Sequence, residues 1–100
     1  MLALTNYKYM NAKAELNIKQ VEFDNIQKAY DAASDAVSTY KDNHDKVKND
    51  TRYLNLKVQE DKLERDKDRL EEAVEHLEED MKAFEKLLKS ENKTATDIEL

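Results

Sequence analysis

The two histidines of the chain both have acidic neighbours, a combination that can bind a metal ion. His76 lies within about one helical turn of Glu72, Glu79 and Asp80. A carboxylate-bridged metal site would need a Glu-x-x-His pair, and position 73 is an alanine, so that motif is missing. The simpler interpretation, a solvated histidine among acids, is the one we favour. We therefore expect no metal ion and no other cofactor.

His44 has Asp42 and Asp45 beside it and lies close to a predicted reversal of the chain. A histidine cation suits the C-terminus of a helix, so His44 could act as a pH-sensitive latch. The alternative that we favour is that His44 simply fills the seam between two packed helices near a frayed turn. Residues 42–45 do not form a calcium loop, because the turn glycine and the terminal glutamate are missing. No Ser-His-Asp group and no buried pair of carboxylates can be identified, so the sequence predicts that the protein is not an enzyme.

An acidic patch surrounds His76 and contains no lysine or arginine. Its members are Glu71, Glu72, Glu75, Glu78, Glu79 and Asp80. Such a patch could bind a basic partner, or imitate nucleic-acid phosphates as an acidic phage protein would. The solvated face of a helix is the alternative that we favour. The net charge of -6 argues against binding of nucleic acid by the chain itself.

Composition excludes most other folds. The 100 residues make one small domain, 40% charged and 39% hydrophobic, without glycine, proline or cysteine. Tight β-hairpins and phosphate-binding loops depend on glycine, so β-rich folds and nucleotide-binding motifs are not expected. No apolar run approaches the length of a membrane span, and no signal-peptide core is present. We therefore expect no membrane insertion and a cytoplasmic location, with export by a non-cleaved route left open.

The elements that must position these residues are two helices with heptad spacing. In the second half of the chain, apolar residues recur every seven residues, and a second row follows four residues after the first. We call the residues that should pack between the two helices the core seam. Its members there are Leu56, Leu63, Leu70, Leu77 and Phe84 at d, with Val74, Met81 and Leu88 at a. In the first half the seam contains Leu16, Phe23, Tyr30 and Val37 at a, with Ile26 at d.

The two seams are out of frame by two residues, which predicts a break between them rather than one continuous rod. We expect a helix over residues 1–48, a turn at 49–51, a helix over 52–90 and a flexible tail at 91–100. Asn49 is able to take a left-handed C-cap conformation, and Asp50 or Thr51 can cap the second helix. A reversal near residue 50 places Leu16 opposite Phe84 and Tyr30 opposite Leu70. The predicted fold is all-α, an antiparallel helical hairpin assembled into a larger helical bundle.

A second apolar stripe lies on the first helix, on a face turned away from the seam. Its members are Leu4, Tyr7, Ala14, Ile18 and Val21, and Leu87 on the second helix is also off the seam. A two-helix hairpin has no third layer to cover such residues. The stripe therefore predicts an interface with another protein surface.

These features favour a structural or assembly protein that forms a homo-oligomer through the second stripe. The alternative is an adaptor, an export chaperone or an inhibitor that docks a different protein through the stripe or the acidic patch. In layout, the predicted hairpin resembles the small antiparallel coiled-coil stalk and chaperone proteins of bacterial flagellar and type III export systems. That resemblance is the basis of the export-chaperone alternative.

Overall fold

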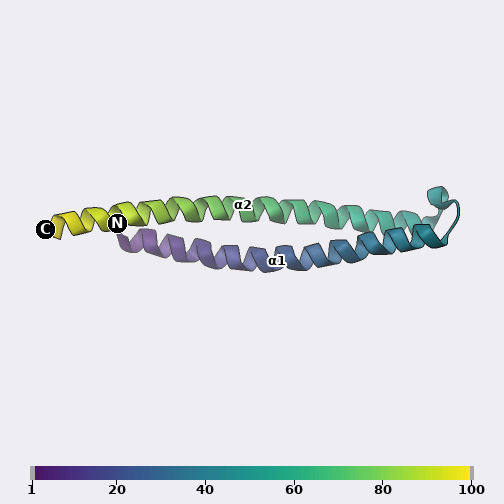
Figure 1. Ribbon diagram of the computed structural model, residues 1–100, viewed down its shortest axis with the longest axis horizontal. Coiled ribbons are helices and arrows are strands. Elements are labelled where there is room, and N and C mark those ends of the chain that lie inside the picture. The colour runs from purple at the N-terminus through teal and green to yellow at the C-terminus, as the bar shows by residue number, and fades with distance from the viewer. Residues whose placement is uncertain (1, 100) are drawn as a thin grey trace. The chain divides into compact units, whose positions relative to one another are not determined.

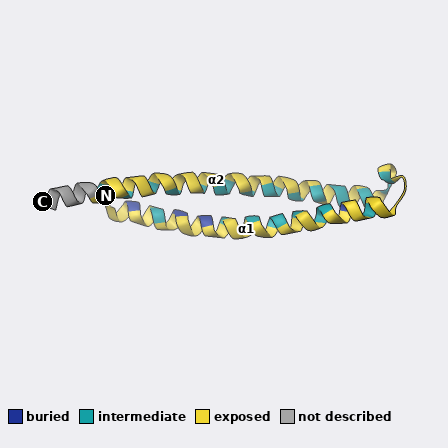
Figure 2. Ribbon diagram, in the orientation of Figure 1, coloured by how far each residue is buried: buried dark blue, intermediate teal, exposed yellow. Residues whose placement is uncertain are grey.

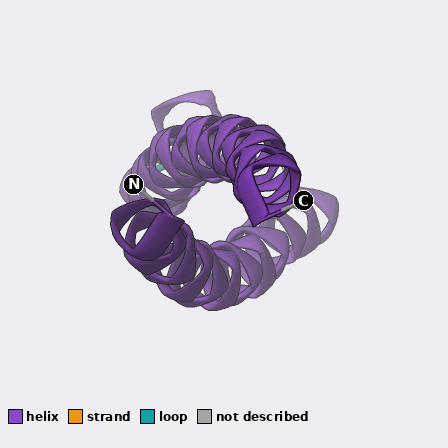
Figure 3. Cartoon of the chain, turned by 90° about the vertical axis from the view of Figure 1, so that its left-hand side faces the viewer, coloured by secondary structure: helices purple, strands orange, loops and turns teal. Residues whose placement is uncertain are grey.

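The computed structural model describes the backbone of residues 2–99 and the side chains of residues 2–92. The chain is an all-α helical hairpin, as the sequence predicted. Helix α1 spans Leu2–Asn43, a short 3₁₀ helix, η1, spans Val47–Asn49, and α2 spans Thr51–Glu99 (Figure 1). The described residues contain no strand (Figure 3). Because glycine and proline are absent from the sequence, nothing interrupts either helix internally.

The reversal of the chain occurs earlier than the sequence predicted. Helix α1 ends at Asn43, and Lys46 takes the left-handed conformation, with φ 58 and ψ 61. Asn49, which we expected to be the left-handed residue, lies in η1 instead. Asp50 is extended and α2 begins directly after it, in agreement with the predicted capping role.

The far end of α2 also differs from the predicted boundaries. The helix continues to Glu99, whereas the sequence pointed to a stop at residue 90. No glycine or proline follows residue 90, and residues such as Asn92 disfavour a helix interior only weakly, so nothing in the sequence ends the helix there. The flexibility of residues 91–100 stays a prediction.

The hairpin divides into two compact units, which we describe separately. The turn unit comprises Val21–Glu71, and the terminal unit comprises Met1–Gln20 and Glu72–Leu100. In both, the residues shielded from solvent form a narrow band along each helix, and most of the remaining surface is exposed (Figure 2). Every residue of the predicted core seam is buried or half-buried.

In the turn unit the only buried side chain among the described hydrophobic residues is Val37, which is 7% exposed. The Lys67 ammonium group lies 4.5 Å from the centre of the Tyr30 ring. A reversal at residue 50 would place residue 60 opposite Tyr40, but the Tyr40 ring stacks on that of Tyr53, with centres 6.5 Å apart. The residues of α2 that face α1 in this unit therefore come earlier in the sequence than predicted. The cause is the earlier reversal at Lys46, because moving the turn moves every residue that packs across it.

The terminal unit shows the same displacement of register. Leu16, 8% exposed, lines a hollow together with Met81. The Tyr9 hydroxyl donates a hydrogen bond of 3.2 Å to Oε1 of Glu85, whereas a reversal at residue 50 would place Tyr9 opposite residue 91. Ala12 is 7% exposed, and Thr5, 6% exposed, donates a hydrogen bond of 2.8 Å from its hydroxyl to Oε1 of Glu91. Thr5 stands seven residues before Ala12, so it extends the d row of the seam as a polar member.

Candidate interaction surface on the first helix

The second stripe predicted from the sequence is exposed along its whole length. Its large members on α1 are Leu4 (45% exposed), Tyr7 (63%), Ile18 (57%) and Val21 (60%), and Ala14 is exposed as well. Groups of this size lie in the same helix as the buried Leu16, which shows that α2 covers only one face of α1. Contiguous apolar side chains exposed along one face of a helix are typical of a contact surface.

The stripe is broader than the heptad spacing predicts. Met10 is 55% exposed and borders the same face of α1. Met10 lies one residue before the heptad position of the stripe, so the heptad spacing does not predict it. A count of all off-seam apolar residues in the first half of the chain would have found it.

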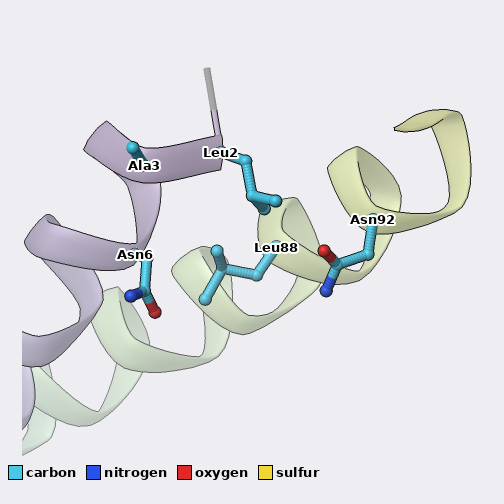
Figure 4. Close-up of a pocket in the computed structure, with 5 residues that line it drawn as sticks. All are labelled: Leu2, Ala3, Asn6, Leu88 and Asn92. Atoms are coloured by element: carbon cyan, nitrogen blue, oxygen red, sulfur yellow. The ribbon is translucent and has the colours of Figure 1, made fainter. Parts of the chain in front are cut away.

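An open hollow of ≈ 520 Å³ lies next to the start of the stripe, within the terminal unit. Leu2, Ala3 and Asn6 of α1 and Leu88 and Asn92 of α2 line it (Figure 4). Its lining combines leucine side chains with two amides.

Leu87, the member of the predicted interface on α2, is 47% exposed. It lies next to the half-buried Leu88 in sequence, so it faces away from the seam. The terminal unit therefore offers apolar contact area on both of its helices.

The acidic patch is exposed at all six of its positions. Nδ1 of His76 lies 4.0 Å from Oε2 of Glu79, and these two side chains are 78% and 77% exposed. Among the described residues no three histidine, aspartate or glutamate side chains converge closely enough to hold a metal ion. A pair so open to water is an exposed contact of little energetic weight.

A cluster of polar and aromatic side chains holds the turn. The Tyr40 hydroxyl donates a hydrogen bond of 2.7 Å to Oδ2 of Asp50, which joins the last turns of α1 to the start of α2. Oδ1 of Asp50 accepts from the backbone N–H groups of Arg52 (2.9 Å) and Tyr53 (3.1 Å), so Asp50 is the N-cap of α2. The hydrogen bond from Tyr40, followed by that from the Tyr53 backbone, lowers the pKa of the Asp50 carboxyl. The same contact with Asp50 raises the pKa of Tyr40.

His44 belongs to this cluster and not to the seam. Its ring stacks on that of Tyr40, with centres 3.8 Å apart and an angle of 15°. Its Nδ1 is 2.8 Å from the Tyr40 carbonyl oxygen, and because a carbonyl only accepts, Nδ1 carries the hydrogen. His44 is exposed and lies just beyond α1, so the interpretation as seam packing is wrong, and its neighbours are structural groups of the turn.

Glu60, a half-buried polar residue of the turn unit, has a hydrogen-bond partner on its own helix. The Lys57 ammonium donates to Oε1 of Glu60 at 2.7 Å, and the Glu60 side chain is only 12% exposed. This hydrogen bond, with a smaller contribution from Ser34, lowers the pKa of Glu60.

No stretch of the described helices combines the length and the apolar character needed to cross a membrane. Comparisons of the chain with protein-family models, with curated proteins and with solved structures find no match.

Proposed function

We propose that the protein is a non-enzymatic assembly protein that self-associates through the exposed stripe on α1. The observation that carries the proposal is the exposure of Leu4, Tyr7, Ile18 and Val21 on one helix of a hairpin with little core of its own. Burying a side chain such as Ile18 or Val21 stabilises a complex by about 1.5–3 kcal/mol. The hairpin itself leaves that stabilisation unused.

The small size of the core supports the same proposal. Among the described hydrophobic residues only Ala12, Leu16 and Val37 are buried, and none of the large side chains is fully enclosed. Two helices alone bury little area, so a hairpin of this kind is only marginally stable, and association adds to its stability. A bundle of two hairpins would cover the stripe and thicken the core together.

The replacement of Ile18 and Val21 by glutamate tests the proposal. The double variant leaves the core seam unchanged, and glutamate has a good helix propensity. It places two charges where the partner must be apolar. We expect unchanged helical circular dichroism and at least a hundredfold weaker self-association, since each lost group is worth about 1.5 kcal/mol or more. Light scattering coupled to size-exclusion chromatography measures the mass.

Leu54 and Val58 provide a matched control. They are 47% and 64% exposed and lie one turn apart on α2, outside the stripe. Glutamate at both positions should leave the mass of the assembly unchanged. A wild-type chain that is monomeric at every concentration tested would overturn self-association.

The second candidate function is an adaptor or inhibitor that docks a different, basic protein. The exposure of all six acidic-patch residues favours it. Here the wild type would be monomeric, and replacing Glu75, Glu78 and Glu79 by glutamine would weaken partner binding, whereas changes in the stripe would not.

A further inference from the structure

The exposed face of α1 carries a complete second heptad seam once its polar member is included. Asn11, exposed like its neighbours, fills the gap between Tyr7 and Ala14. We call the set the outer seam: Leu4, Asn11 and Ile18 at a, with Tyr7, Ala14 and Val21 at d. A single asparagine at an a position is a known means of fixing register and partner number in coiled coils. The stripe is therefore shaped for one more helix.

The spacing of the outer seam is the same when it is read in either direction. Its steps are three, four, three, four and three residues. Two copies of α1 lying antiparallel consequently match every member with a partner: Leu4 with Val21, Tyr7 with Ile18, and Asn11 with Ala14. The small Ala14 leaves room for the Asn11 amide at the centre of the contact.

The charged residues beside the outer seam distinguish the two possible orientations. Lys8 and Glu15 each follow a d residue, at the e position, and both are exposed. In an antiparallel pair the e edges of the two helices meet, so Lys8 of each copy lies near Glu15 of the other. In a parallel pair the e edge meets the g edge, where Ala3, Met10 and Asn17 carry no charge. Charges at the e and g edges set orientation in coiled coils, and here they favour the antiparallel pair.

We propose that two copies of the chain associate through an antiparallel contact of α1 with α1, centred between Asn11 and Ala14. Lys8 and Glu15 form two equivalent ion pairs across the two-fold axis. The partner is thus a second copy of this chain, and the inference rests on the self-association proposed above. The interface is isologous, which is the usual form of a dimer contact.

Single cysteines test the orientation directly, because the chain has none of its own. Chains carrying Asn11→Cys and chains carrying Ala14→Cys are mixed in a glutathione redox buffer, and mass spectrometry identifies the disulfide dimers. The antiparallel contact brings residue 11 of one copy next to residue 14 of the other, so mixed dimers should exceed both like-with-like dimers severalfold. Predominant like-with-like dimers would overturn the antiparallel arrangement while leaving self-association intact.

The remaining outcomes separate this inference from the proposed function. Absence of a disulfide in a chain that keeps its wild-type assembly mass would show that the outer seam is not the contact. Absence of a disulfide in a monomeric chain would overturn both proposals.

Charge exchange adds a readout that does not depend on cysteine. Lys8→Glu and Glu15→Lys should each weaken association by about fivefold, and the double exchange should restore it. The two positions are two helical turns apart within one chain, so rescue cannot come from an intrachain pair. Failure of the double exchange to restore association would overturn the proposed pairing.

Discussion

The core seam runs through both the terminal unit and the turn unit, but the two units differ in the face of α1 that points away from α2. In the terminal unit the outer face carries Leu4, Tyr7 and Ile18, all exposed. In the turn unit the same heptad positions begin with the exposed Val21 and continue as Asn25 and Lys28, which are polar and need no cover. Because both units form the hairpin, the apolar residues on the outer face are not required for it. All of them except Val21 lie in the terminal unit, where we therefore expect the proposed association.

The two units also differ in what holds their helices together. The terminal unit buries Ala12 and Leu16, and its buried polar residue Thr5 is hydrogen-bonded to Glu91. The turn unit buries only Val37 and relies on the contact of Tyr40 with Asp50 at the reversal. The stability of the terminal unit should therefore come mainly from apolar burial. In the turn unit, the hydrogen bond between Tyr40 and Asp50 should determine which residues of the two helices meet.

The largest effect is expected from Leu16→Ala in the terminal unit. Removing a leucine side chain from a buried site costs about 2–5 kcal/mol, and Leu16 is only 8% exposed. Urea unfolding followed by circular dichroism measures the change, in the Ile18→Glu and Val21→Glu background so that association does not contribute. Leu54→Ala removes the same atoms from a side chain that is 47% exposed, and it should cost under about 1 kcal/mol. Equal costs for the two variants would contradict the assignment of Leu16 to the core.

The core seam and the exposed stripe were both predictable, because helix periodicity determines which residues share a face. The register between the helices was not. A seven-residue repeat looks the same after any shift along it, so only the turn decides which residues meet. That turn depends on Lys46, a residue without any preference for the left-handed conformation, and on a hydrogen bond between Tyr40 and Asp50. Asn11 was missed for another reason, since a search for apolar residues passes over the polar member of a seam.

Lys46→Gly should stabilise the turn unit. Lys46 is the only described non-glycine residue with a positive φ, a conformation that costs most L-residues about 1–2 kcal/mol. Glycine removes that cost but adds freedom to the unfolded chain, so the net gain should be below about 1 kcal/mol. Lys48→Gly is the control, because Lys48 lies in η1 without a positive φ, and glycine there should destabilise the protein. Thermal unfolding should therefore move in opposite directions for the two variants.

The smallest expected effect is the acid sensitivity of the turn, and Asp50→Asn reveals it. The Tyr40 hydroxyl, the largest cause, and the backbone N–H of Tyr53 lower the pKa of Asp50 below its ordinary 3.8 in the folded protein. The ionised carboxylate therefore contributes stability at pH values above 3.8, and this contribution is lost as the pH falls through the lowered folded-state pKa. Asparagine still accepts the capping hydrogen bonds but does not ionise, so it lacks this contribution.

The wild type should accordingly be more stable than Asp50→Asn at neutral pH, and the difference should narrow in acid. Taking the difference between the two proteins removes the titration of the other acidic residues, which both share. Tyr40→Phe removes the largest cause of the lowered pKa. In the Tyr40→Phe background, the difference in the free energy of unfolding between the proteins with aspartate and asparagine at position 50 should be smaller at neutral pH. It should also change less between neutral pH and acid. Urea midpoints measured along a pH series test this, and an unaltered pH profile in the Tyr40→Phe background would show that the tyrosine hydroxyl does not hold the turn.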